Sequence, residues 1–543
     1  MLAGFTEPRR AWRAVGESGV VSRFEALRSE AAPFVGARRR TRPPAAALAA
    51  GESRRRARGS ALRGAGDREI APDRGAVGAH RQRSRLRYFC SPHYQDSALH
   101  PFITQLERAT GFAPDDTVEQ KLGRLRELLA SGARSDDEIE LVAEMLSLPS
   151  TAAGLNLSPQ RKREMLFEAL LNQLGAEGRH RPVLMVFEDA HWIDPTSREV
   201  LDLSVDRVRH LPVLLVITFR PEFQPPWGGR SHILNLLLNR LGERDGESLV
   251  QKLARNAALA PDIIAEIVER TDGVPLFVEE LTKAVLESAA QGDRVAAVLA
   301  PKSLAALSVP PTLHAALMAR LDRLGSAAKE IAQIGAVLGR EFACELIEPV
   351  AQRPDRGLQA ALDELNAAGL LFCRGTAPHA SYLFKHALVQ DAAYSTLLRV
   401  RRQDLHARVA AALEQHFPDL VERQPELLAH HLMAAGNAER GVDQWLKAGQ
   451  HAAAQFAYLE AIAHFERGLS LLHSLPESPI RNGREIELQL ALGLCLFTAK
   501  GALAAKPAHT RALELAESSG EPQQRFEALY GCGSQLAMTC LVV

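Results

Sequence analysis

Two adjacent carboxylates, Glu188 and Asp189, directly follow an apolar run in the segment VLMVFEDAHWIDPTS. Carboxylate oxygens are ligands that Mg²⁺ prefers, and a carboxylate can also polarise the water that attacks a phosphate. Their order favours the metal role for Glu188 and the base role for Asp189, but the sequence alone leaves the two roles exchangeable. A strand that merely ends in solvent-facing acids is the plainer interpretation, and the continuation His191-Trp192-x-Asp194 argues against it.

Polar residues also end a second apolar segment, PVLLVITFRPEF, where Thr218 and Arg220 stand. A hydroxyl and a guanidinium at the tip of a neighbouring strand could reach the terminal phosphate of a nucleotide. Arg suits this role, since its guanidinium forms bidentate hydrogen bonds to phosphate. On its own, Arg220 is interpreted equally well as a surface residue that closes a strand.

A third feature is the turn in RTDGVPLFVEELTKAVLE, where Gly273 and Pro275 end one helix and begin the next. Proline is favoured in the first helical turn, and glycine breaks a helix. Taken alone, this pattern is more typical of an ordinary connection between two helices than of a binding site.

The elements that position these residues follow from the apolar periodicity. The segment 183–188 is a short apolar run typical of a buried parallel strand, and 213–219 is another. Between them, Asp194 caps a helix that begins at Pro195 and Thr196. Strand, helix and strand with short links form a βαβ unit, which predicts a doubly wound parallel sheet with its site at the carboxyl ends of the strands.

Beyond residue 301 the pattern becomes helical. Three short helices and a hairpin, LLFCRG with SYLFKH, predict a winged-helix-like region. From Gln424 onward the chain is helical, and residues 444–478 resemble one tetratricopeptide unit closed by Pro476. Small residues stand where its helices should pack closely: Ala448, Gly449, Ala461 and Gly468. The predicted fold is an α/β P-loop NTPase-like parallel sheet, then an all-α winged-helix-like region, then α-helical tetratricopeptide-like repeats.

In this order and spacing, the motifs resemble the STAND class of P-loop ATPases, the signal-transduction ATPases with numerous domains. More closely, they resemble the AAA-like ATPase module that follows an adenylate/guanylate cyclase domain in bacterial regulators. The likeness runs along almost the whole chain, from LAGFTEPRRAWRAVGESGVVSRFEA, similar to the end of a cyclase domain, to YLFKHALVQDAAYSTLL. The resemblance implies ATP and Mg²⁺ as cofactors, with nucleotide contacts at Glu188, Asp189, Arg220, Gly273 and Pro275.

Two parts of that family's pattern are missing. The metal-binding core of a cyclase would lie before Met1, so we expect no cyclic-nucleotide synthesis by this chain. No G-x-x-x-x-G-K-[ST] loop occurs either, and that loop supplies the backbone N–H groups and the Lys that hold the phosphates. Where it is expected, residues 37–87 hold fifteen arginines, no aromatic residue and five Leu, Ile or Val.

A basic disordered linker and a shifted reading frame both account for this segment. Reading the second and third base of each codon with the first base of the next, residues 59–73 can encode V-L-L-S-G-E-P-G-I-G-K-S-R-L, a strand followed by a phosphate loop. Residues 37–42 can encode R-E-E-E-L in the same frame. We therefore favour a frameshift, and we expect the first strand, the phosphate loop and the start of the next helix to be missing and ATP binding to be weak.

Composition sets the remaining limits. Lys+Arg 65 equals Asp+Glu 65, so overall charge favours neither nucleic acid nor a membrane surface. No apolar run approaches the roughly 18 residues of a spanning helix, and the start lacks the pattern of a signal peptide. The scattered cysteines form no C-x-x-C pair, which suits a reducing compartment: Cys90, Cys344, Cys373, Cys495, Cys532 and Cys540. We expect a cytoplasmic protein.

We expect five segments. They are 1–36, the end of a cyclase domain and its linker; 37–87, shifted in frame and disordered; 88–300, the rest of the ATPase domain; 301–423, the winged-helix-like domain; and 424–543, a truncated array of repeats.

The leading functional hypothesis is a nucleotide-dependent ATPase switch whose repeats bind a regulatory protein or a small-molecule signal. Two alternatives stay open: a fragment of a LuxR-like ATP-dependent transcription regulator, and a non-catalytic protein-binding scaffold. DNA binding by the winged-helix-like region is disfavoured because its third helix is acidic and apolar, whereas a helix that contacts phosphates is basic. The oligomeric state is not predicted.

Overall fold

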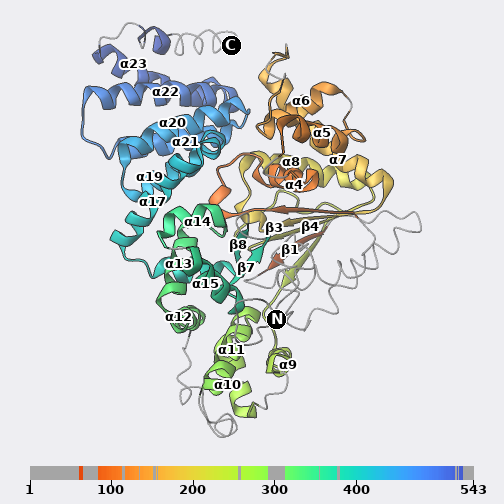
Figure 1. Ribbon diagram of the computed structural model, residues 1–543. Coiled ribbons are helices and arrows are strands. Elements are labelled where there is room, and N and C mark those ends of the chain that lie inside the picture. The colour runs from red at the N-terminus through yellow and green to blue at the C-terminus, as the bar shows by residue number, and fades with distance from the viewer. Residues whose placement is uncertain are drawn as a thin grey trace, which may run out of the picture. The chain divides into compact units, whose positions relative to one another are not determined.

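The computed structural model describes residues 60–64, 84–112, 116–133, 135–150, 154–155, 157–254, 259–291, 312–353, 355–375, 380–519, 523 and 525–529 (Figure 1). They fall into two compact units: residues 312–412 form one, and the described residues on either side of them form the other. The second unit contains both a parallel sheet and the helical repeats.

A five-stranded parallel sheet is the centre of the second unit, with the strand order β2-β3-β4-β1-β5. Its strands are β1 (Ser60–Gly64), β2 (Ser84–Phe89), β3 (Val183–Glu188), β4 (Val213–Phe219) and β5 (Leu234–Leu238). Every residue of β3 and β4 is buried. Alternate side chains enter cores on opposite faces, so these two strands need continuous apolar sequence, and the predicted βαβ unit is confirmed.

Strand β1 corrects one expectation. The sequence predicts that the first strand is missing, but Ser60–Gly64 pairs in parallel with β4 on one side and β5 on the other. The alternation of Ala61, Leu62 and Arg63 is too short to reveal a strand by periodicity, and the partners that fix it are more than 150 residues away in sequence. The predicted loss of the phosphate loop concerns residues 65–83, which lie outside the described residues.

Helices pack on the sheet and beside it. Apolar residues of α4 (His100–Thr110), α7 (Pro159–His180) and α8 (Pro195–Arg207) share one core with β3 and β4. The side chain of Ser158 caps α7 and that of Asp194 caps α8, as the sequence predicts for α8. The remaining elements of this part are α5 (Val118–Leu129), α6 (Asp136–Met145), η2 (Pro92–Tyr94), η4 (Ala190–Trp192), η5 (Val208–His210), α9 (Glu243–Ala254), α10 (Pro261–Thr271) and α11 (Pro275–Gln291).

The unit of residues 312–412 contains the three predicted helices and the predicted hairpin. The helices are α13 (Gly325–Leu338), α14 (Cys344–Ala351) and α15 (Asp355–Ala367), preceded by α12 (Leu313–Arg323) and followed by α16 (Ala387–Ser395) and α17 (Arg399–His416). Strands β7 (Leu371–Arg374) and β8 (Ser381–Phe384) form the hairpin, and β6 (Glu341–Ala343) adds a third antiparallel strand. The region is therefore not all-α, as the predicted fold class has it, because the predicted hairpin is part of a three-stranded sheet. The sequence did not predict β6, since a three-residue strand is too short to carry a periodic signal.

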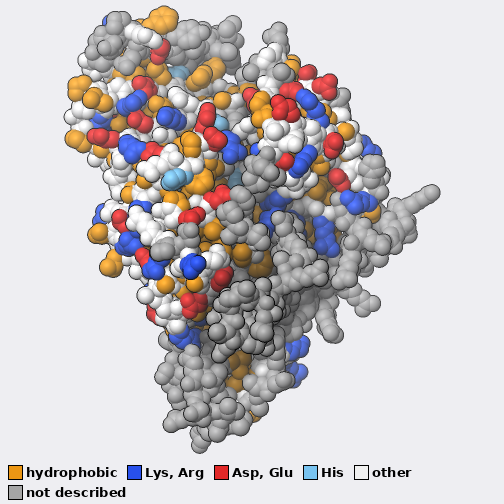
Figure 2. Space-filling model, in the orientation of Figure 1, with side chains coloured by type: hydrophobic (Ala, Val, Ile, Leu, Met, Phe, Trp, Pro, Cys, Tyr) orange, Lys and Arg blue, Asp and Glu red, His pale blue; other side chains and the backbone are white. Residues whose placement is uncertain are grey.

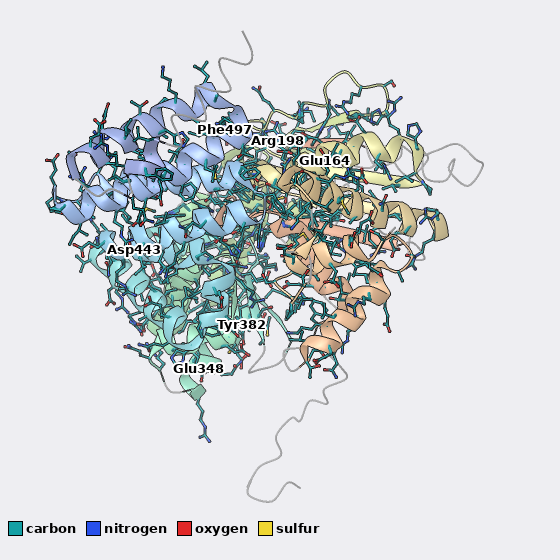
Figure 3. The ribbon with its side chains drawn as sticks, turned by 90° about the horizontal axis from the view of Figure 1, so that it is seen from above. Glu164, Arg198, Glu348, Tyr382, Asp443 and Phe497 are labelled. Carbon is teal, nitrogen blue, oxygen red and sulfur yellow. The ribbon has the colours of Figure 1, made fainter. Side chains whose placement is uncertain are left out.

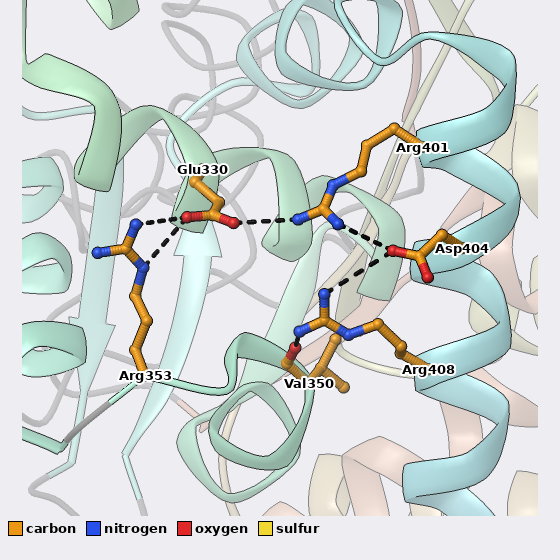
Figure 4. Close-up of polar contacts among 6 residues, drawn as sticks. All are labelled: Glu330, Val350, Arg353, Arg401, Asp404 and Arg408. Carbon is orange, nitrogen blue, oxygen red and sulfur yellow. Dashed lines mark hydrogen bonds and ion pairs between the residues drawn. The ribbon is translucent and has the colours of Figure 1, made fainter.

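A chain of ion pairs and hydrogen bonds joins α17 to α13 and α14 (Figure 4). Glu330 accepts from Arg353 at 2.5 Å and from Arg401 at 3.0 Å, and Arg401 also bonds Asp404 at 2.8 Å. Arg408 donates to the carbonyl of Val350.

The helical repeats comprise α18 (Pro418–Arg423), α19 (Pro425–Ala435), α20 (Ala438–Ala454), α21 (Tyr458–Leu472), α22 (Pro479–Lys500) and α23 (Ala502–Ser519). The predicted helix pair is α20 and α21. A Cβ on Gly449 of α20 would lie 2.2 Å from the ring of Phe465 on α21, and one on Gly468 of α21 would lie 3.3 Å from Cβ of Trp445 on α20. The prediction that small residues let these helices approach closely is confirmed.

Over the described residues, no helix combines the length and the apolar character needed to cross a membrane. On the face drawn in Figure 2, acidic and basic side chains are interspersed over the described helices, in line with a formal net charge of +0. Cys90, Cys344, Cys373 and Cys495 are free thiols, and Cys532 and Cys540 lie outside the described residues.

Candidate functional site

The acid pair lies at the carboxyl edge of the parallel sheet. Glu188 is the last residue of β3, and Asp189 follows it with φ 58° and ψ 40°, a left-handed conformation that turns the chain into η4. The backbone N–H of Asp189 donates to Oγ1 of Thr218 on β4 at 3.0 Å, and both residues are buried. Thr218 therefore holds the acid pair's backbone, a role that the sequence did not predict for it.

Glu188 faces a cation that sequence reasoning missed. A guanidinium nitrogen of Arg87, on β2, lies 4.0 Å from Oε1 of Glu188, and the two side chains are 7% and 11% exposed. A backbone hydrogen bond from Cys90 to the carbonyl of Glu188 holds the ends of β2 and β3 together. A basic residue inside the short apolar run RLRYF is the one sequence signal that could have indicated this partner.

Arg220 lies one residue beyond β4, next to the turn that follows the acid pair. Its guanidinium carbon lies 5.1 Å from the ring centroid of Trp192 in η4, a distance suited to a cation–π contact. The structure therefore brings Arg220 together with the segment that carries Glu188 and Asp189, as the sequence predicts from adjacent strand tips.

Asp194 fixes the far end of that turn. One of its carboxylate oxygens accepts from the backbone N–H of Ser197 at 2.7 Å and of Leu99 at 3.0 Å. Asp194 is 1% exposed, and this burial, together with the charge of Glu460, raises its pKa to about 8. Acids also dominate the surroundings of Cys90: burial and then the charges of Asp194, Asp189 and Glu188 raise the pKa of its thiol.

Gly273 and Pro275 lie in the helix group α9–α11. Gly273 has φ +66°, and a Cβ there would lie 2.2 Å from the carbonyl oxygen of Leu241, so only glycine fits. The backbone N–H of Leu241 donates to the carbonyl of Gly273 at 2.8 Å, and Arg240 forms an ion pair with Asp272. The contacts of this turn explain its glycine by packing, and its predicted role in nucleotide binding stays a prediction.

The described residues contain no group of three or more His, Cys, Asp or Glu side chains arranged to hold a metal ion. A cation at Glu188 and Asp189 would thus need further ligands from water or from a bound molecule. That requirement matches Mg²⁺, which is commonly held by one or two carboxylates together with water and phosphate oxygens.

Comparison with known proteins gives two likenesses. The chain is 29% identical over 550 residues to an uncharacterized protein, R02095, of Rhizobium meliloti (strain 1021), and the match covers 98% of this chain and 52% of that protein. The chain thus spans about half the length of this relative. No protein-family model matches the sequence.

Among solved structures, the chain is similar to a STAND protein with a tetratricopeptide repeat sensor, PH0952 from Pyrococcus horikoshii. The TM-score is 0.44 with 14% sequence identity, and the match covers 92% of this chain and 67% of the other.

Proposed function

We propose that this chain is the nucleotide-dependent switch module of a signal-transduction protein, an ATP-binding regulatory ATPase with helical repeats. The observation that carries the proposal is the acid pair at the carboxyl edge of an all-parallel sheet, with the Asp189 backbone fixed by Thr218. In sheets of this kind, ligands bind outside the carboxyl ends of the strands.

The position of β1 supports the same proposal. Leu62 of β1 is in register with Thr218 of β4, so Gly64 ends β1 at the edge that carries the acid pair. Strands in a sheet lie about 4.8 Å apart, and β1 is two strands from β3, which puts its end roughly 10 Å from Glu188. A phosphate loop that followed β1 would thus start within reach of a metal ion shared with the acid pair.

Glu188 and Asp189 would hold Mg²⁺, which when bound would neutralise charge on the phosphates. Asp189 is the better candidate for the metal, because Arg87 competes for the Glu188 carboxylate. Arg220 is placed to meet the terminal phosphate. The turn at Gly273 and Pro275 would contact the nucleotide, as the STAND resemblance implies.

At a finer level we propose that the module belongs to the STAND class and to regulators of the adenylate/guanylate cyclase type. The sequence motifs support this placement. The repeats would bind a regulatory protein or a small-molecule signal and change the state of the ATPase part.

We further propose that ATP binding is impaired in this chain, because the sequence lacks the G-x-x-x-x-G-K-[ST] loop. The alternative frame across residues 59–73 contains such a loop, which supports a pair of compensating frameshifts. Sequencing codons 36–88 and identifying the peptides of residues 37–87 by mass spectrometry test this origin. Peptides that match the sequence as written, from a confirmed gene, would establish a native linker.

Titration calorimetry with ATP and Mg²⁺ tests the function on three versions of the full chain: as written, with the alternative frame restored between residues 37 and 85, and restored with Asp189→Asn. We expect weak or no binding by the first, micromolar binding by the second, and a loss of the Mg²⁺-dependent part in the third. Micromolar binding by the chain as written contradicts the impairment. No binding by the restored chain contradicts the ATP-dependent function.

A further inference from the structure

Three polar contacts join the helical repeats to segments that follow β2 and β3. Thr196 at the start of α8 meets Glu460 of α21, Ser97 donates to Glu426 of α19 at 2.5 Å, and Asp96 pairs with Arg467 of α21. We call these three pairs the repeat seam. Figure 3 shows the same helices from above, with Arg198 of α8 labelled beside the repeat helices.

Glu460 makes the most buried of these contacts. The backbone N–H of Thr196 donates to one carboxylate oxygen of Glu460 at 2.7 Å, and the Thr196 hydroxyl donates to the other at 2.9 Å. Glu460 is 1% exposed and Thr196 is 3% exposed. Because both side chains are buried, the two donors of Thr196 depend on this one carboxylate.

The contact lies at the N-terminus of α8, where it stabilises the first turn of the helix. The first backbone N–H groups of a helix lack partners within the helix and carry its positive end, so an acidic side chain stabilises them. Asp194 satisfies the N–H of Ser197, and Glu460 satisfies that of Thr196. Helix α8 is therefore capped by two carboxylates, one from its own N-cap and one from a repeat helix 264 residues away.

The capped end of α8 is linked to the acid pair by a short, fixed stretch of chain. Asp189 is held by Thr218, Trp192 lies under Arg220, and Asp194 bonds both Ser197 and Leu99. Six residues lie between Asp189 and Thr196. Because this connecting segment is short and held at several points, a displacement of the N-terminus of α8 is transmitted to the acid pair.

We propose that Glu460 is a positioning residue: as an external cap on α8, it couples the docking of the repeats to the geometry of the acid pair. A repeat array that binds its partner and moves α21 withdraws the Glu460 carboxylate, and the first turn of α8 then loosens. The consequence for nucleotide binding rests on the proposed function, but the coupling itself does not.

The seam has the character of a separable contact. Besides its polar pairs, it borders a partly open cavity of about 60 Å³ lined by residues that include Ser97, His100, Glu426, His451 and His464. Nδ1 of His464 is buried and has no hydrogen-bond partner in the described part of the chain. Polar cavities of this size hold ordered water, and wet, polar contacts are typical of interfaces that form and break.

Hydrogen exchange of the full chain, measured by mass spectrometry on peptides of residues 189–200, tests the coupling without nucleotide. We expect Glu460→Ala to speed exchange at the start of α8 roughly 5- to 30-fold, the range expected for a lost helix cap. Glu460→Gln keeps an oxygen acceptor for Thr196 and should restore most of the protection. Glu466→Gln, an exposed position on the same helix, is the matched control and should change nothing.

A second measurement separates coupling from a general loss of stability. In Glu460→Ala, peptides of α7 should keep wild-type exchange while those of residues 189–200 lose protection. Equal acceleration of both, or no acceleration in residues 189–200, overturns the proposal. Failure of ATP binding in the frame-restored chain would leave these exchange results standing and would count only against the proposed function.

Discussion

At the scale of single residues, Thr218 shows how a side chain can serve a site without touching a ligand. Asp189 has left-handed backbone angles, which cost energy in a residue other than glycine unless the surroundings hold them. The Thr218 hydroxyl supplies that hold by accepting from the Asp189 N–H at 3.0 Å in a buried setting. The orientation of the acid pair therefore depends on a hydroxyl in the next strand.

Replacing Thr218 by Val keeps the shape of the side chain and removes the acceptor. A buried N–H left without a partner costs about 1–3 kcal/mol, so we expect Thr218→Val to lower the free energy of unfolding by that amount in urea titrations. Thr218→Ser keeps the hydroxyl and should recover most of the loss. Equal stability of the Val variant and the wild type would mean that Asp189 finds another acceptor.

The sequence predicted residues whose role is local and missed those whose partners are distant. The acid pair, the Asp194 cap and the Arg220 position follow from strand ends and helix starts, which neighbouring residues define. Arg87 and Glu460 act through residues about 100 and 264 positions away, and one sequence carries no record of such pairings.

At the scale of elements, the helix pair α20 and α21 is set by a glycine. A Cβ on Gly449 would lie 2.2 Å from the Phe465 ring, and Phe465 is 1% exposed, so the ring has little room to move. The sequence predicts this pair because small residues at helical spacing indicate that two helices pack closely. The sequence does not predict β1, whose formation depends on two strands far along the chain.

Gly449→Ala is accordingly expected to destabilise the protein by about 1–3 kcal/mol, the usual cost of overpacking a core. Gly483 on α22 is the matched control, since nothing lies within 4 Å of a Cβ built there. Gly483→Ala should be neutral or stabilise by up to about 1 kcal/mol, because alanine favours helix. Circular dichroism in urea compares the two variants, and equal effects would show that Phe465 repacks freely.

At the scale of the whole molecule, the order of the segments along the chain does not match their grouping into compact units. Residues 310–412 intervene between the sheet and the repeats in sequence, yet the repeats belong to the same compact unit as the sheet. Composition and periodicity do not predict this, because the residues that join the repeats to the sheet part are far apart in sequence, as Thr196 and Glu460 are. The contacts between the repeats and the sheet part also bury ionisable side chains, whose pKa values are shifted.

Carboxyls of the seam are more easily protonated than usual. Burial, with a smaller contribution from Asp96, raises the pKa of Glu426 from 4.5 to about 7, against the opposing hydrogen bond from Ser97. Burial also raises the pKa of Glu460, with Glu199 adding to the effect and the Thr196 bonds opposing it. A raised pKa means that the folded state holds a proton that the unfolded chain releases. The contribution of Glu426 to the free energy of unfolding is therefore complete below about pH 4.5 and is lost as the pH rises through about 7.

His464, which lines the same cavity, has the opposite effect on how stability changes with pH. Burial lowers the pKa of His464 from 6.5 to about 4, so its contribution is lost as the pH falls toward 4. The contribution of His464 is the same in Glu426→Gln and in the wild type, so it cancels when the free energies of unfolding of the two proteins are compared. Gln cannot ionise, so the wild type should lose about 1–3 kcal/mol of unfolding free energy relative to Glu426→Gln between about pH 5 and pH 8. The difference between wild type and Glu466→Gln should stay flat over that range, and a flat difference for Glu426→Gln would show that Glu426 is hydrated in the folded protein.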